Sequence, residues 1–302
     1  MAEPNLALVD TKRSRLLEVG DAAAAAAGKA EGHLEIVRPI RNGRLVDVAI
    51  AERYFRQIFK KMGFGRLGKP AVALATPPHC TAAEKKVLAS TLSKAGASSV
   101  IFVDALLAAA IGAQLDIQGP RGSMVASVGA QTTFAGVLAL GEALTVTWEL
   151  TGGASISSAI ADYLRSQYNF IILDQDLEEL KLSLLDLSNP DVDLSARVLG
   201  RDAETGGEAE VTIRAREVYD ASLEPAKLIV DTIVAALVKA PAEIAKDLVE
   251  TGLTLVGRAS LTTGLDAVLE QSCSIPVTHS TIVETAAVVG TARLLGQVPI
   301  GG

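Results

Sequence analysis

The chain has 302 residues, of which 49% are hydrophobic and 21% charged, so it is long enough for two compact lobes with separate cores. A formal net charge of −7 without a dense Lys/Arg patch argues against a nucleic-acid-binding protein. Cys80 and Cys273 form no metal-binding or redox motif and are typical of reduced buried thiols. The N-terminus lacks a signal-peptide pattern, and no uncharged apolar run approaches the about 18 residues that span a bilayer.

The first half of the chain alternates short apolar runs with helical patterns. Two N-terminal strands flank the polar turn Asp10–Arg15, and the alanine run Ala22–Ala27 favours one or two helical turns. The spacing of apolar residues predicts a helix over Val48–Met62, and Thr81 with Glu84 forms a capping box. The other expected elements are strands at Leu6–Val9, Leu16–Val19, Ala71–Ala75, Val100–Val103 and Met124–Val128, and helices at Thr81–Ala95 and Ala105–Ala113.

The second half begins with a predicted hairpin over Thr132–Leu150 that turns at Gly141-Glu142. Arg214–Ala240 has helical periodicity, with a kink or break expected at Pro225. Alternation of strands and helices in two sets indicates two α/β lobes. The remaining expected elements are helices at Ile156–Tyr168, Leu177–Leu185, Ala242–Leu248, Leu261–Glu270 and Val283–Leu295, and strands at Ala196–Leu199, Ala209–Ile213, Leu253–Val256 and Val277.

Several segments carry a family pattern in one order and spacing. Arg38–Asp47 reads RPIRNGRLVD, and Ala108–Ala113 reads AAAIGA. Together with later segments they resemble the bacterial actin MreB family, whose corresponding motifs read roughly IRPLKDGVIAD and AAAIGA. The resemblance spans nearly the whole chain, from Glu35 to Leu295. The segments that continue the match are Gly119–Met124, Glu217–Glu224, Val238–Leu248 and Gly264–Asp266.

This resemblance implies an α/β fold of the two-lobed actin-like (ribonuclease H-like) ATPase type. Lobe I would comprise residues 1–124 plus 290–302, and lobe II residues 125–289 with a small IIB subdomain at 162–223. The interval that holds the family's peripheral IB subdomain is only residues 20–37 here, so IB is expected to be vestigial. Proteins of the family assemble into protofilaments under the membrane and organise cell-wall growth.

Both phosphate-binding motifs of the family are degraded in this chain. The first, DxGTANT, falls on VDTKRSR, so Val9 replaces the Asp of the metal shell and Thr11 replaces the Gly. The second, DIGGGTT, falls on SVGAQTT, so Ser127 replaces its Asp. Mg²⁺ needs carboxylates to position its water shell, and phosphate loops need closely approaching backbone amides. We therefore expect weak binding of metal and phosphate.

The motifs for catalysis and for the nucleoside are altered too. The catalytic carboxylate of the family falls on Ala105, which can neither orient nor deprotonate water. The ribose motif GDE falls on Gly153–Ser155, the adenosine-side GGG falls on Gly257–Ala259, and a Glu of the KIEIG helix falls on Ser183, after the retained Lys181. Losing three or more charge-assisted hydrogen bonds removes roughly 5 kcal/mol, or an affinity factor of about 10³–10⁴.

The residues that remain define a residual nucleotide site. No catalytic residue and no metal ligand is assigned, no cofactor is expected, and Mg-ATP would bind at most weakly. Arg258 could fill the empty adenosine pocket and pair with an acid, whereas Lys12, Arg13 and Arg15 either bind an anion without metal or form a solvated turn, which is the commoner case. The residues of the residual site are Asp10, Thr11, Lys12, Gly129, Thr132, Thr133, Gly152, Gly153, Gly257 and Arg258.

The loop Gly63–Lys69 interleaves apolar and basic residues, and it corresponds in position to a family loop that enters the membrane. Met62, Phe64 and Leu67 are the candidate membrane contacts, with neighbouring lysines and arginines placed to meet anionic headgroups. The alternative is a loop whose Phe64 packs onto its own lobe.

Because the chain keeps the family's motifs outside the nucleotide site but lacks the nucleotide-binding residues, we predict an MreB-like pseudo-ATPase. We expect it in the cytoplasm, and at the inner face of the membrane if the loop inserts. Its partners would be itself or an MreB-type filament, and no nucleic acid. Two alternatives stay open. One is a filament-forming actin that binds ATP weakly and hydrolyses it slowly; the other is a non-polymerising adaptor on an actin-like scaffold.

Overall fold

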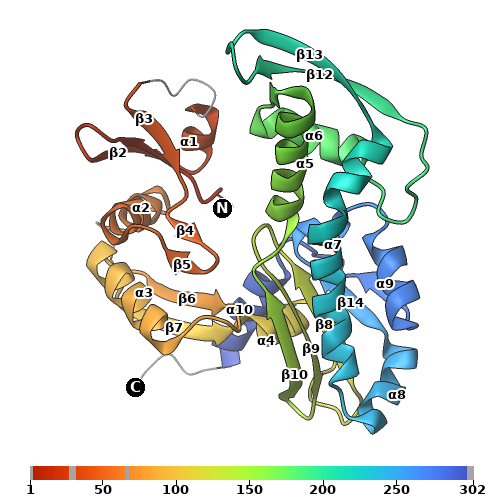
Figure 1. The fold of residues 1–302 in the computed structure, drawn as a ribbon. Helices are drawn as coiled ribbons and strands as arrows, with labels where there is room; N and C mark the ends of the chain where they lie inside the picture. The colour runs from red at the N-terminus through yellow and green to blue at the C-terminus, as the bar shows by residue number, and fades with distance from the viewer. Residues whose placement is uncertain (1–2, 27–31, 66–67, 298–302) are drawn as a thin grey trace. The chain divides into compact units, whose positions relative to one another are not determined.

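The computed structural model describes residues 3–26, 32–65 and 68–297. Clustering of the packing contacts divides the chain after Asp104 into two compact units, which we call unit 1 and unit 2. Each unit mixes helices with sheets, as the alternation of strands and helices predicts (Figure 1).

Two helices of unit 2, α4 (Ala105–Gly112) and α10 (Ala286–Gln297), pack tightly against each other. A Cβ atom on Gly112 would lie 1.8 Å from the carbonyl oxygen of Ala286, and one on Gly290 would lie 1.8 Å from that of Ala108. Only glycine permits such an approach. The contacts thus group these helices with unit 2, whereas the family-based lobes assign residues 105–124 and 290–302 to lobe I; those lobe boundaries remain a prediction.

Unit 1 holds small sheets and the helices that cover them. Strand β1 lies between β2 and β3 and is antiparallel to both. Strands β6 and β7 pair with each other in parallel, and α3 connects them along the chain. Residues 20–37 supply α1 and β3, and part of this interval, 27–31, lies outside the described residues. The elements are β1 (Ala7–Asp10), β2 (Arg15–Val19), α1 (Asp21–Ala26), β3 (Leu34–Val37), β4 (Ile40–Arg41), β5 (Arg44–Leu45), α2 (Val48–Lys61), β6 (Ala71–Thr76), α3 (Ala82–Ala95) and β7 (Ser99–Asp104).

Local signals start the two longer helices of unit 1. The Asp47 carboxylate accepts hydrogen bonds from the backbone N–H groups of Ala49 and Ile50, which caps α2. The predicted capping box of Thr81 and Glu84 is confirmed at the start of α3. The apolar face of α2 packs on the first sheet and completes the core of this unit.

Unit 2 is built on a larger sheet with the strand order β10-β9-β8-β14-β15. The hairpin of β9 and β10 is antiparallel, whereas β8, β14 and β15 run parallel. A small sheet of β11, β12 and β13 lies within residues 162–223, the range expected for the IIB subdomain. The strands are β8 (Ser123–Val128), β9 (Thr133–Ala139), β10 (Glu142–Glu149), β11 (Phe170–Ile171), β12 (Ser195–Asp202), β13 (Glu208–Arg214), β14 (Leu253–Val256) and β15 (Val277–His279).

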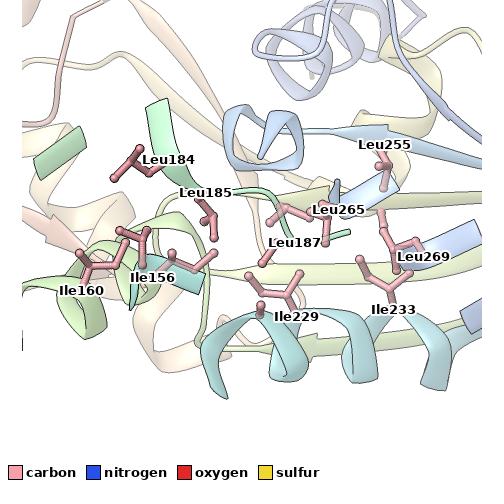
Figure 2. Close-up of a cluster of buried hydrophobic side chains, with 14 of the residues drawn as sticks. Ile156, Ile160, Leu184, Leu185, Leu187, Ile229, Ile233, Leu255, Leu265 and Leu269 are labelled. Carbon is pink, nitrogen blue, oxygen red and sulfur yellow. The ribbon is translucent and has the colours of Figure 1, made fainter. Parts of the chain in front are cut away.

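The helices of unit 2 supply most of its core. Figure 2 shows Ile156 of α5, Ile229 and Ile233 of α7, and Leu265 and Leu269 of α9 gathered in one cluster of buried side chains. Burial of each such side chain contributes about 1.5–3 kcal/mol. Besides α4 and α10, the helices are α5 (Gly153–Tyr168), α6 (Asp174–Leu184), α7 (Ala215–Val238), α8 (Ala242–Thr251), the 3₁₀ turn η2 (Arg258–Leu261) and α9 (Leu265–Cys273).

The break that was one alternative at Pro225, and the start expected for a later helix, are wrong in this region. Helix α7 runs from Ala215 to Val238 without a break at Pro225, which is buried in the packed face of the helix. Tertiary packing therefore outweighs the helix-breaking tendency of proline there. The helix expected over Leu261–Glu270 starts later than predicted: Gly264 has a left-handed backbone (φ +79°), and α9 begins only at Leu265.

Candidate functional site

The turn after β1 carries the first group of predicted nucleotide residues, and its polar groups bind one another. Asp10 is buried at the end of β1, and its Oδ1 atom accepts a hydrogen bond from the backbone N–H of Arg13 at 2.9 Å. Its Oδ2 atom lies 3.7 Å from Nε2 of His33. Both the N–H and the hydroxyl of Thr11 donate to the carbonyl oxygen of His33 at 2.9 Å. The Asp10 carboxylate therefore stabilises the turn that follows β1.

The cations of the same turn point outward. Lys12, Arg13 and Arg15 are all exposed. A guanidinium nitrogen of Arg53 on α2 donates to the carbonyl oxygen of Ser14, which fixes the turn against the helix. Exposure agrees with the solvated-turn alternative for Lys12 and Arg13. Arg15 differs, because its side chain lines a small hollow together with residues of α2.

The second predicted phosphate loop, Gly129–Thr132, links β8 to β9 in unit 2. The N–H of Gly129 donates to the carbonyl oxygen of Thr132 at 2.9 Å, which closes the loop on itself. The hydroxyl of Thr133 is buried and donates to the carbonyl oxygen of Thr151 at 2.8 Å. The loop is thus held by bonds within the protein.

The N-terminus of α5 meets this loop directly. The N–H of Gly153 donates to the carbonyl oxygen of Gly129 at 3.0 Å, and the N–H of Ala154 donates to that of Ala130 at 2.7 Å. The first N–H groups of a helix lack partners within it and are the usual donors to an anion. Here two of these donors are already bonded to the loop.

Close packing explains three of the retained glycines without any ligand. A Cβ atom on Gly152 would lie 2.3 Å from the carbonyl oxygen of Gly129, and one on Gly153 would lie 2.8 Å from Cβ of Ala259. Gly257 has φ +85°, and its Cβ would lie 2.5 Å from the carbonyl oxygen of Val128. A side chain at any of these positions would collide with the protein itself.

A polar network that the sequence did not reveal ties α6 to the first turn of α5. Nζ of Lys181 lies 2.8 Å from Oγ of Ser157, 2.7 Å from Oε2 of Glu178 and 3.4 Å from the carbonyl oxygen of Gly153. Ser157 also donates to Glu178, and the Lys181 side chain is only 10% exposed. The spacing of three between Glu178 and Lys181 was the available signal.

Arg258 does not fill a pocket. Its side chain is 82% exposed, and its Nε atom lies 3.7 Å from Oε1 of Glu284, itself 58% exposed. An ion pair this exposed contributes little to stability. Close by, the hydroxyl of Ser260 is fully buried and has no hydrogen-bond partner among the residues that the structure describes.

The positions expected to have lost their carboxylates lie at strand and helix ends. Val9 is buried within β1, Ala105 is buried at the first position of α4, and Ser127 is half-buried near the end of β8. Within the described parts of the chain, no group of three or more His, Cys, Asp or Glu side chains is placed to hold a metal ion.

The loop after α2 gives a mixed result for the predicted membrane contacts. Met62 is 53% exposed, whereas Phe64 is half-buried against the core of unit 1, as the alternative interpretation expects. Leu67 and Arg66 lie outside the described residues. Among the helices that the structure describes, none is long and apolar enough to cross a membrane.

A hollow of about 850 Å³ lies elsewhere on unit 2, between α7 and α9. Tyr219, Leu223 and Val268 are among the residues that line it, together with Asp220 and Lys227. None of the predicted nucleotide residues lines this hollow.

Comparison with known proteins identifies the class of this chain. The family described as MreB/Mbl protein matches residues 1–299. The cell shape-determining protein Mbl of Bacillus subtilis (strain 168) is 26% identical over 294 residues, covering 97% of this chain and 88% of that protein. The cell shape-determining protein MreB of Escherichia coli (strain K12) is 28% identical over 286 residues, covering 94% and 82%.

Solved structures agree with this assignment. MreB5 of Spiroplasma citri bound to AMPPNP has a TM-score of 0.88 at 26% identity, covering 98% of this chain and 89% of that one. The MamK double helical filament has a TM-score of 0.78 at 15% identity, covering 98% and 92%, and supports the fold alone. The fold is therefore the two-lobed actin-like α/β fold. The chain belongs to the MreB/Mbl protein family and is an MreB-like bacterial actin homologue of the cytoskeletal, shape-related class.

Proposed function

We propose that this family member is a pseudo-ATPase that assembles with itself or with an MreB-type filament and organises cell shape or the envelope without a hydrolysis cycle. The observation that carries the proposal is that the first turn of α5, beside the expected phosphate loop, is already engaged by other groups of the protein. The first N–H groups of α5 donate to the carbonyl oxygens of Gly129 and Ala130, and Lys181 is held by Ser157 and Glu178.

The residues present do not fit a magnesium-bound nucleotide. Val9, Ala105 and Ser127 offer no carboxylate to a metal shell or to an attacking water. The neighbouring carboxylate, Asp10, accepts a hydrogen bond from its own turn. We therefore derive no hydrolytic step. The proposed location is the cytoplasm, and contact of Met62 and its loop with the inner face of the membrane remains part of the proposal.

Self-assembly is supported by membership of the MreB/Mbl family, because the resemblance to that family implies assembly into protofilaments. The test combines calorimetric titration with Mg-ATP, a phosphate-release assay and negative-stain microscopy of protein treated with apyrase and EDTA. We expect no saturable micromolar binding, no phosphate release, and filaments that form at the same protein concentration with and without ATP. An ATP-hydrolysing family member serves as the positive control. Micromolar binding with turnover would overturn the proposal.

One observation favours a second candidate function, a filament-forming actin that binds nucleotide weakly. MreB5 of Spiroplasma citri was solved bound to AMPPNP and to ADP. In this chain the atom nearest to a Cβ on Gly129 would be the carbonyl oxygen of Thr132 at 3.2 Å, so this part of the loop is less crowded than Gly152 or Gly257. Filaments that appear only when ATP is added would favour this second function, whereas monomers at every concentration would favour the adaptor alternative.

A further inference from the structure

A group of cations on unit 1 lies outside the residual nucleotide site. Arg53, Arg56 and Lys60 are spaced by three and four residues, so they share one face of α2. Together with Arg15 of β2 and with Gln57, they line a hollow of about 270 Å³. Strand β2 and helix α2 come from the same compact unit, in which α2 packs on the first sheet (Figure 1).

The charges around this hollow, which we call the basic groove, are not balanced by acids. Among the residues that the structure describes, only Arg56 of these cations pairs with a carboxylate, that of Glu52, at 2.7 Å. Arg53 donates to a neutral backbone carbonyl, that of Ser14. The other three cations form no ion pair with any described residue: Arg15, Arg53 and Lys60. Like charges on one helix face repel, and a bound anion would relieve that repulsion.

The shape and donors of the basic groove select the kind of anion. Its volume is just below the roughly 300–1,000 Å³ typical of pockets for drug-sized ligands, so it suits a small charged group rather than a whole nucleotide. Guanidinium groups present a planar fork that matches phosphate oxygens, and a lysine ammonium adds a point charge. The side chain of Leu16 lines the hollow and is buried, which leaves the cations as the exposed lining.

We propose that Arg15, Arg53, Arg56 and Lys60 form a binding site for a phosphate group, carried by a soluble phosphate compound or by a lipid headgroup. None of the residues assigned to the residual nucleotide site lines this groove. The site is therefore independent of whether the protein binds or hydrolyses ATP.

The test uses the full chain and pyrophosphate as the soluble probe, with binding measured by calorimetry at low salt. The groove variant is Arg15→Gln/Lys60→Gln, because these exposed side chains have no ion pair to lose. The control variant is Arg197→Gln/Lys246→Gln, which removes the same charge from unit 2. Loss of two charge-assisted contacts should weaken pyrophosphate binding at least about tenfold in the groove variant and leave the control close to wild type. Thermal unfolding confirms that both variants fold, and the single variant Lys60→Gln should give a smaller loss.

A second arm identifies the source of the phosphate. Flotation with vesicles of phosphatidylglycerol and phosphatidylcholine, compared with phosphatidylcholine alone, tests the headgroup. Flotation lost only in the groove variant indicates a lipid source; unchanged flotation with weakened pyrophosphate binding indicates a soluble one. Either result supports the site. Equal pyrophosphate affinity in the groove and control variants, or no binding by the wild-type protein at millimolar pyrophosphate, would overturn it.

Discussion

The backbone N–H of Gly153 donates to the carbonyl oxygen of Gly129 at 3.0 Å, which joins the expected ribose motif to the expected phosphate loop. The same approach leaves no room for a side chain at Gly152. Glycines at the expected nucleotide site can therefore reflect how the chain packs on itself, and they are not by themselves evidence of a bound phosphate. This distinction can be measured.

Gly257→Ala should be strongly destabilising whether or not nucleotide is present. The position has φ +85°, and a Cβ would lie 2.5 Å from the carbonyl oxygen of Val128, so we expect a loss of more than about 2 kcal/mol in urea unfolding. Gly206→Ala is the matched control, because it has φ +70° but nothing within 4 Å of the added Cβ, and about 1 kcal/mol is expected there. Equal losses in the two variants would contradict the packing explanation.

The network around Lys181 should show measurable coupling. Glu178→Ala leaves the Lys181 ammonium nearly buried with only neutral partners, and we expect a loss of about 1–2 kcal/mol. Lys181→Met in the same chain should recover part of it, because a buried apolar side chain replaces an unpaired charge. A double-mutant cycle in urea measures the coupling. The exposed pair Arg216 and Asp220 is the control, and its coupling energy should be at most about 0.5 kcal/mol. A coupling energy between Glu178 and Lys181 that is no larger than this would argue against the network.

Ser260→Ala should leave stability unchanged or raise it by about 1 kcal/mol. The hydroxyl is fully buried without a hydrogen-bond partner among the described residues, so its removal relieves a desolvation cost and leaves little space. Ser222→Ala is the control, because that buried hydroxyl donates to the carbonyl oxygen of Val218 at 2.7 Å and its loss should be destabilising. Thermal unfolding compares the two; a clear destabilisation by Ser260→Ala would indicate that the hydroxyl has a partner.

Stability should fall on acidification partly through Glu217. Burial raises the pKa of its carboxyl, but hydrogen bonds from Tyr168, the backbone of Arg214 and Tyr163 outweigh burial and bring the pKa below 4.5. A lowered folded-state pKa gives stability that is present above the unfolded value and is lost as pH falls through the folded value. Glu217→Gln removes this titration. The stability difference between wild type and variant should therefore shrink between about pH 7 and about pH 3.

Urea unfolding at several pH values measures this difference. The exposed variant Glu243→Gln is the control. Curves for wild type and Glu217→Gln that stay parallel down to about pH 3 would contradict the role of Glu217.

Local signals in the sequence predicted most of the elements. The capping box at Thr81, the hairpin of β9 and β10, and the periodicity of α2 all depend on neighbours close in sequence, and each is confirmed. The hairpin turns at Leu140-Gly141, however, one residue before the expected Gly141-Glu142, and Glu142 already pairs with Ala139. The break allowed for at Pro225 and the helix start expected before Gly264 are absent for opposite reasons. At Pro225 packing of α7 overrides a local preference, and at Gly264 a single left-handed residue delays a helix whose apolar pattern starts earlier.

The sequence by itself determined the family and the absence of carboxylates at Val9, Ala105 and Ser127, because a residue's chemistry does not depend on its surroundings. Only the tertiary structure decided how the remaining groups are used. Gly153 is bonded to Gly129, Lys181 is enclosed by Ser157 and Glu178, and Arg15 joins the basic face of α2. Apart from Glu178 and Lys181, which are three residues apart, these partners are distant along the chain. Hydrogen bonds and charge interactions depend on distance in space, which sequence spacing does not give.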